Sequence, residues 1–177
     1  MQYDARTMQN NTGSLNRYFI IINCIKYYVE HSIMLYVLQQ NQYNFKHVNY
    51  GDKDINYVNE SSHFTKLYYH TSYVSVYGIF IKLPIQNMII IPSYRYSKIN
   101  LNVAMNSDMI HFIEKVEHDI LNPLKKNKKM LISNELKSGM IKVNEKNRKN
   151  RGNVVLKIIG IWETNTTCGL KYKYFFY

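Results

Sequence analysis

The feature that most constrains the fold is a pair of long strand-like segments at the C-terminal end of the chain. The first is NVVLKIIGIWE, residues 153–163, and the second is GLKYKYFFY, residues 169–177, with the turn TNTTC between them. Both are rich in β-branched and aromatic residues, which favour strands, and the short polar connection predicts an antiparallel hairpin. One face of such a hairpin must enter a core.

Alternation along the hairpin predicts two faces with different chemistry. One face of the first strand contains Val154, Leu156, Ile158, Gly160 and Trp162. On the return strand, Leu170, Tyr172, Tyr174 and Phe176 lie opposite Lys171, Lys173, Phe175 and Tyr177. With one face in the core, the other offers lysines, including Lys157, beside Phe175 or Tyr177, and can hold phosphates and stack bases. The alternative is a solvated lysine face, with Trp162 in the core.

The charge of the chain indicates a polyanionic partner. Its 177 residues include 23 lysines and arginines against 12 acidic residues, which gives a net charge of +11, and 14% of the residues are aromatic. Basic charge combined with aromatic rings is typical of proteins that bind single-stranded nucleic acid. The alternative is that AT-rich codons enrich lysine, asparagine, isoleucine and tyrosine, so motifs built only from these residues carry little weight.

Two basic runs flank a strand that is predicted at 140–143. The first run contains Lys125, Lys126, Lys128 and Lys129, and the second contains Lys146, Arg148, Lys149 and Arg151. Lysines and arginines that neutralise phosphates release counterions and make binding dependent on salt. Solvated loops or a nuclear-import signal are the alternatives. We predict that both runs, together with Lys157, Lys171, Tyr172 and Lys173, form a nucleic-acid site.

The remaining segments predict further strands and one clear helix. Strands are expected within 18–29, 33–38, 63–85 (two strands), 88–96 and 98–105, and a connecting loop at 39–62. Gly78 inside a strand indicates a bulge or a sharp bend. Asn106 or Ser107 can cap a helix that Pro123 ends. Apolar residues recur at helical spacing within it, at Met109, Ile110, Ile113, Val116, Ile120 and Leu121, so one helix face is expected to be buried.

This order of elements predicts a mainly β protein of the α+β class with one or two helices. An OB-fold-like small barrel, with a helix between its third and fourth strands, has the same order. Residues 1–55 are expected to form an N-terminal extension with two strands, and residues 56–177 an OB-like nucleic-acid-binding domain.

The sequence contains no pattern that predicts an enzyme. It lacks a phosphate-binding loop, a dinucleotide fingerprint, a zinc-protease motif and a nucleophile elbow. His111, Glu114 and His118 share one face of the predicted helix and could ligate a metal, but polar residues are expected on that face in any case. We therefore predict no catalytic residues, no metal and no cofactor.

The sequence also predicts neither secretion nor membrane insertion. Cys24 and Cys168 are far apart and form no disulfide or zinc pattern. The N-terminal residues lack the features of a signal peptide, and charged residues interrupt the most apolar stretch, 18–38.

Four segments have a familiar order and spacing: 64–83, 117–122, 135–143 and 156–175, of which the ending G-I-W-E…G-L-x-Y-K-Y/F is the most specific part. Together they resemble a family of single-stranded DNA-binding proteins from large nucleocytoplasmic and related insect DNA viruses. The resemblance implies an OB-type core and supports Gly160, Trp162, Gly169, Leu170, Tyr172 and Lys173 as pattern residues. One departure is that phage and bacterial single-strand binders often end in an acidic tail, whereas this chain ends in KYKYFFY.

These observations favour a protein that coats exposed single-stranded DNA during viral replication or recombination. It is expected in the infected cell, in the nucleus or at a cytoplasmic replication site. The alternative is a structural virion protein, of a capsid or nucleocapsid, with a basic surface that faces the genome. A preference for DNA over RNA, and assembly into a homo-oligomer, are left open by the sequence.

Overall fold

The computed structural model describes residues 36–55, 62–93, 96–144 and 153–177. The chain divides into two compact units, residues 1–36 and 37–177, and the second unit contains all the elements below. The strand predicted at 18–29 lies outside the described residues. Of the strand predicted at 33–38, only the end is described, where Leu38 forms a single bridge with Ile81.

The described unit is mainly β with two α-helices, so the predicted α+β class is confirmed. The strands are β1 (Val48–Ile55), β2 (His63–His70), β3 (Ser75–Tyr77), β4 (Ile79–Leu83), β5 (Ile89–Pro92), β6 (Tyr96–Asn100), β7 (Asn127–Lys129), β8 (Met140–Asn144), β9 (Val154–Glu163) and β10 (Thr167–Phe176). The helices are α2 (Ser107–Leu121) and α3 (Leu131–Lys137), with 3₁₀ turns η1 (Gln40–Gln42), η2 (Phe45–His47) and η3 (Ala104–Asn106).

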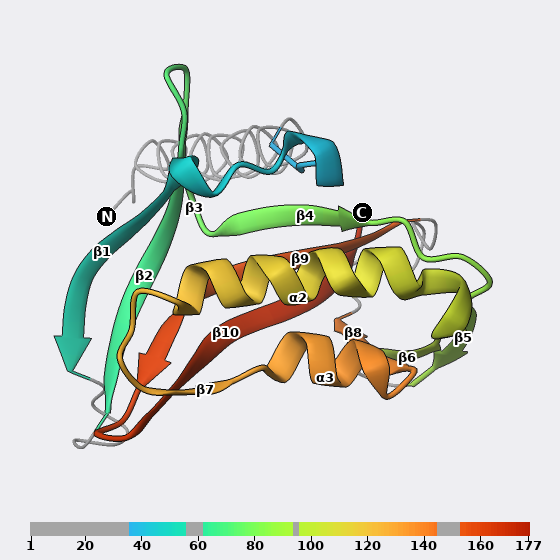
Figure 1. Cartoon of the computed structure of the whole chain (residues 1–177). Helices are drawn as coiled ribbons and strands as arrows, with labels where there is room; N and C mark the ends of the chain where they lie inside the picture. The colour runs from blue at the N-terminus through green and yellow to red at the C-terminus, as the bar shows by residue number, and fades with distance from the viewer. Residues whose placement is uncertain (1–35, 56–61, 94–95, 145–152) are drawn as a thin grey trace, which may run out of the picture. The chain divides into compact units, whose positions relative to one another are not determined.

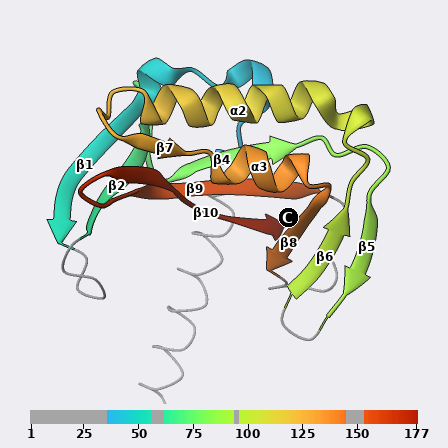
Figure 2. The same ribbon diagram turned by 60° about the horizontal axis from the view of Figure 1, so that its bottom comes forward.

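The strands form one mixed sheet with the order β1-β2-β9-β10-β8-β6-β5 (Figure 1). β10 pairs antiparallel with β9 and parallel with β7 and β8, while β9 pairs on its other side with β2 and then with β4. β1 and β5 are the two ends of this order, so the described sheet is open and the predicted barrel is not confirmed. Figure 2 shows that both ends of the sheet extend away from the helices.

The helices cover one face of the central strands (Figure 1). α2 has the predicted bounds, and its buried side chains include all of the predicted apolar residues. They pack in one core with β-strand residues such as Leu156, Ile158 and Leu170. Asn106 precedes α2 as predicted, but its amide group bonds to the backbone of Gln86 and Asn102 and does not cap the helix.

β1, α3 and the short strand β7 were not predicted from the sequence. β1 falls inside the expected loop 39–62, because its polar residues are ordered by pairing with β2 rather than by an apolar pattern. α3 begins where the buried carboxylate of Glu117, on α2, accepts hydrogen bonds from the N–H groups of Ile132 (3.1 Å) and Ser133 (3.0 Å). The hydroxyl of Ser133 donates to the same carboxylate at 3.0 Å. Glu117 therefore provides hydrogen-bond acceptors for N–H groups in the first turn of α3, although it belongs to a different helix.

Gly78 lies at the predicted irregularity and lets the chain change partners. β3, before it, pairs with β2, and β4, after it, pairs with β9. Its φ is +86°, and an added Cβ would lie 2.9 Å from the carbonyl oxygen of Ile158. This backbone conformation favours glycine because it has no Cβ.

We expect Gly78→Ala to lower the free energy of unfolding by about 1–3 kcal/mol for the strained backbone alone, with the contact to Ile158 adding to the loss. Gly139→Ala is the matched control: its φ is +76°, but a Cβ there would meet its nearest neighbour at an ordinary 3.4 Å. Urea denaturation of both variants measures the difference. Equal losses would contradict a steric role for Gly78.

Candidate nucleic-acid interface

One extra residue in β9 decides which side chains share a face of the central hairpin. Lys171 of β10 pairs with Gly160, but the next residue, Tyr172, pairs with Ile158, so Ile159 has no partner in the ladder. A bulge of this kind reverses the alternation beyond it. Gly160 and Trp162 therefore lie on the face of Lys157. The prediction that they share a face with Val154, Leu156 and Ile158 is wrong.

We call the sheet face opposite α2 and α3 the basic face. Its lysines, assigned by strand register, are Lys66, Lys82, Lys98, Lys129, Lys142, Lys157, Lys171 and Lys173. Among the acidic residues that the structure describes, Asp54 of β1 is paired into this face, and it lies 3.4 Å from Lys66. Five of the described acidic residues, Asp108, Glu114, Glu117, Asp119 and Glu135, belong instead to α2 and α3. Positive charge is thus concentrated on one side of the sheet.

Two aromatic rings lie over glycines on the basic face. Trp162 pairs with Gly169, and a Cβ on Gly169 would lie 2.5 Å from Cζ2 of the indole. Phe64, the cross-strand partner of Trp162 in β2, lies in the same way over Gly160. Because glycine has no side chain, each ring rests on the backbone and remains partly exposed. We call Phe64 and Trp162 the aromatic platform.

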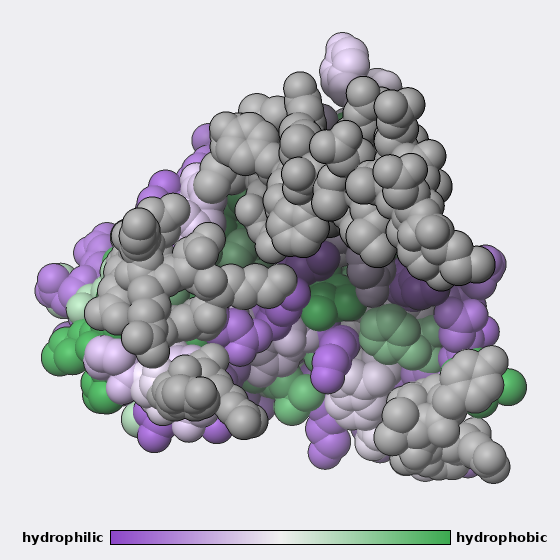
Figure 3. Space-filling view, turned by 180° about the vertical axis from the view of Figure 1, so that it is seen from behind, coloured by the Kyte–Doolittle hydropathy of each residue, from purple (hydrophilic) through white to green (hydrophobic). Residues whose placement is uncertain are grey.

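Lysines surround this platform and continue beyond it. Lys66 and Lys171 are the two neighbours of Gly160 across the sheet, and Lys129 is the neighbour of Gly169. Further along β9, Lys157 Nζ lies 5.0 Å from the ring of Tyr77 and 4.6 Å from that of Phe80. Figure 3 shows hydrophilic and hydrophobic residues interleaved on the part of this side that is not drawn in grey.

The predicted site residues divide into those on the basic face and those elsewhere. Lys129, Lys157, Lys171 and Lys173 share the basic face. Tyr172 lies on the helix side, where its hydroxyl donates to Glu135 Oε2 at 2.7 Å. Burial and this carboxylate raise the pKa of Tyr172 above its ordinary value, so the phenol stays protonated. Tyr172 is therefore placed to join β10 to α3 rather than to stack bases.

Two of the four lysines of the first basic run form hydrogen bonds within the protein. Lys128 donates to Asn122 at 3.1 Å, and Lys126 donates to the carbonyl oxygen of Thr164 at 2.6 Å. Lys125 is exposed in the connection between α2 and β7. The second run, Lys146, Arg148, Lys149 and Arg151, lies outside the described residues.

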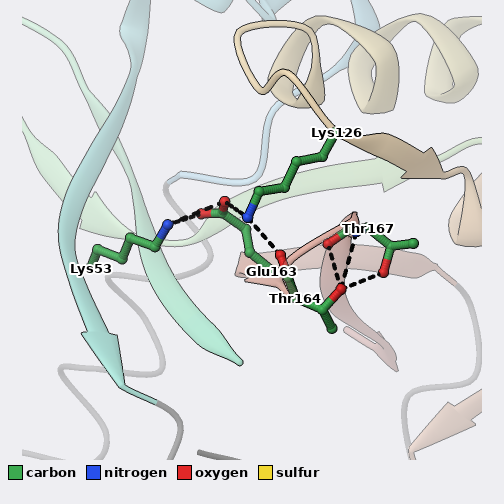
Figure 4. A network of polar contacts seen from close by, with 5 residues as sticks. All are labelled: Lys53, Lys126, Glu163, Thr164 and Thr167. Carbon is green, nitrogen blue, oxygen red and sulfur yellow. Dashed lines mark hydrogen bonds and ion pairs between the residues drawn. The ribbon is translucent and has the colours of Figure 1, made fainter. Parts of the chain in front are cut away.

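A buried carboxylate fixes the turn of the hairpin to its neighbours. Glu163 is 5% exposed and lies 2.9 Å from Lys126 and 3.3 Å from Lys53 of β1 (Figure 4). Burial alone would raise the pKa of Glu163, but hydrogen bonds and charge from the two lysines lower it below the ordinary value. The turn is closed by Thr164 Oγ1, which accepts from the N–H of Thr167 at 3.0 Å. Glu163 therefore ties β1 and the segment before β7 to the end of β9.

Several residues of this interface were missed or misplaced by the sequence analysis. Phe64 and Lys66 alternate with buried Thr65 and Leu67 in β2, so the period of two could have identified them. Lys98 and Lys142 lie in short strands with no unusual pattern. Only the pairing of distant strands brings them to the same face.

The described residues contain no group of three histidine, cysteine, aspartate or glutamate side chains that could hold a metal. Glu114, one of the three residues considered for a metal, lies 2.6 Å from Lys137.

No helix within the described ranges is long and apolar enough to cross a membrane. Cys168 is a buried free cysteine, and burial raises the pKa of its thiol.

Comparison of the chain with protein-family models, with curated proteins and with solved structures finds no match. The geometry of the basic face is therefore the basis for the proposed function.

We expect Glu163→Gln to lower the free energy of unfolding at neutral pH by about 1–3 kcal/mol, because Lys53 and Lys126 would lose a charged acceptor. The folded pKa of Glu163 is lowered. Its stabilising effect is therefore complete above the unfolded pKa and disappears as the pH falls through the folded value. Chemical denaturation across this acidic range should show wild type and variant converging at low pH.

Glu114→Gln is the matched control for this measurement. The Glu114 and Lys137 side chains are 38% and 43% exposed, so their ion pair should contribute at most about 1 kcal/mol. A loss in Glu114→Gln as large as that in Glu163→Gln would contradict the role given to Glu163.

Proposed function

We propose that the protein binds single-stranded nucleic acid, in particular the single-stranded DNA exposed during viral replication or recombination, on its basic face. The observation that carries this proposal is the aromatic platform, with Lys66, Lys129 and Lys171 around it. Partly exposed rings that lie over glycines can stack with an unpaired base, while lysines beside them neutralise the adjoining phosphates.

The arrangement favours a single strand over a duplex for a physical reason. In a duplex the bases are stacked on each other, so a flat ring on a protein surface can reach only the backbone. An unpaired base can stack on Trp162 or Phe64, with a gain of about 1–3 kcal/mol per base that depends little on the sequence. The platform therefore supplies a preference that charge alone does not supply.

The relationship to viral single-stranded DNA-binding proteins of OB type is part of this proposal. α2 follows the strands β1 to β6 and precedes β7 to β10, so a helix between two groups of strands is the feature shared with the OB order. The glycines of the segments G-I-W-E and G-L-x-Y-K have a steric role in this chain. Because Gly160 and Gly169 have no side chain, the rings of Phe64 and Trp162 can lie over them.

A structural virion protein is the second candidate, and the end of the sheet at β5 favours it. Ile89 and Ile91 of this strand are 65% and 44% exposed. Exposed apolar residues on a terminal strand promote pairing with another copy. High abundance in purified particles, with self-association in the absence of nucleic acid, would favour this candidate over a replication protein.

We expect Trp162→Leu to weaken binding to a labelled single-stranded oligonucleotide by about 1–3 kcal/mol while leaving the slope of affinity against salt unchanged, because the change removes a stacked ring and no charge. Anisotropy titrations with single-stranded and double-stranded oligonucleotides of equal length, over a salt series, measure both quantities. In the wild type, emission from Trp162 should change when the single strand binds.

Tyr172→Phe is the matched control, since Tyr172 lies on the helix side, and its affinity should equal that of the wild type. Trp162→Phe keeps a ring at the platform and should retain part of the affinity. Equal, purely salt-dependent binding to single and double strands would contradict the proposal and would move the structural protein to first place.

A further inference from the structure

Four lysines of the basic face lie in register across four adjacent strands. Lys157 of β9 pairs with Lys173 of β10, and Lys142 of β8 pairs with Lys98 of β6. The two pairs are neighbours in the sheet. β10 and β8 are parallel, and Tyr174 pairs with Val143, so the residues before them, Lys173 and Lys142, lie side by side. We call this set the lysine row. It runs perpendicular to the strands.

The row has a length and boundaries that follow from the sheet. Neighbouring strands are about 4.8 Å apart, so the four lysines span about 14 Å. On one side the register continues to Phe80 of β4, and on the other to Ile91 of β5. Rings accompany the row at two of its positions, Phe80 beside Lys157 and Tyr96 beside Lys142. The row is thus a line of positive charge with apolar groups at its ends.

Such a row opposes the stability of the sheet itself. Like charges directly opposite each other on a sheet are destabilising, and this face has two such pairs side by side. An anionic chain laid along the row would reduce the repulsion at Lys98, Lys142 and Lys173 at once. A single isolated anion would relieve only part of it.

We propose that the bound single strand passes the aromatic platform and Lys171 and then crosses the sheet along the lysine row, from β9 toward β6, rather than continuing along the β9–β10 hairpin. This inference rests on the proposed function and adds the path of the strand. A path along the hairpin would use Lys157, Lys171 and Lys173 but would leave Lys98 and Lys142 without a role. The crossing path uses the charges of both pairs.

The test compares four single variants of the row, Lys98→Gln, Lys142→Gln, Lys157→Gln and Lys173→Gln, with Lys115→Gln as control. Lys115 is exposed on α2, on the other side of the sheet. Each row variant should reduce the slope of log affinity against log salt by about 0.7, the value for one phosphate contact to a single strand. Lys115→Gln should keep the wild-type slope. Circular dichroism confirms that each variant is folded.

The outcomes separate this inference from the function on which it rests. If the wild type does not bind single-stranded DNA, both proposals fail. If it binds, but Lys98→Gln and Lys142→Gln keep the wild-type slope while Lys157→Gln and Lys173→Gln lose part of it, the strand follows the hairpin. The crossing path alone is then overturned.

A second measurement needs no nucleic acid. Because the lysines of the row repel one another, Lys142→Gln should raise the unfolding midpoint of the free protein at low salt, and the gain should shrink as salt increases. Lys115→Gln should show no such salt-dependent gain. If the unfolding midpoint of Lys142→Gln equals that of the wild type at low salt, the lysines of the row do not repel one another measurably, and this step of the inference is contradicted.

Discussion

The ladder between β9 and β10, with its extra residue at Ile159, is the interaction on which the rest of the structure depends. β9 also pairs with β2 and β4, and β10 with β7 and β8, so the remaining strands attach either to this hairpin or to β2, β8 and β6. The extra residue determines which side chains of β9 lie on each face of the sheet. It keeps Ile161 and Leu170 under the helices while it turns Trp162 outward. One unpaired residue therefore determines both the core and the candidate interface.

Charged side chains are stabilised in different ways on the two sides of the sheet. On the helix side, carboxylates are satisfied by groups from distant elements, as Glu117 is by the first turn of α3 and Glu163 by two lysines. On the basic face, rings flank Lys157 and Lys142. A ring attracts a cation by about 0.5–1 kcal/mol at an exposed site without cancelling its charge. The lysines can thus be held in place and still attract a phosphate.

Local pattern was sufficient to predict the elements that have a clear period. The hairpin, α2 with its buried face, the irregularity at Gly78 and the two faces of β10 were all predicted and are present. The face of Trp162 was wrong because a period of two assumes that no residue is inserted, and nothing in KIIGIW shows that Ile159 is the extra one. α3 is short, and its first turn needs Glu117 from another helix, so its own residues gave a weak signal.

The interface was harder to predict because it depends on which strands become neighbours. β1 is a strand only because β2 orders it, and the lysine row exists only because β10 and β8 run parallel in the right register. An OB-type barrel was predicted from the order of elements and from the resemblance to viral single-stranded DNA-binding proteins. Order does not state whether the first and last strands meet, and here β1 and β5 are the ends of an open sheet.

The C-terminal motif combines structural and exposed residues, and the structure separates them. Gly160 and Gly169 support rings, Glu163 fixes the turn, and Leu170 is part of the core. Trp162, Lys171 and Lys173 are the members that reach the basic face. Substituting a glycine would displace a ring, and at Gly160 a Cβ would also lie 2.5 Å from the carbonyl oxygen of Thr65 in β2. Substituting an exposed lysine would remove a contact and leave the fold intact. A sequence pattern of this kind therefore identifies a folded hairpin. The binding role of the hairpin depends on the few exposed side chains that the fold does not need.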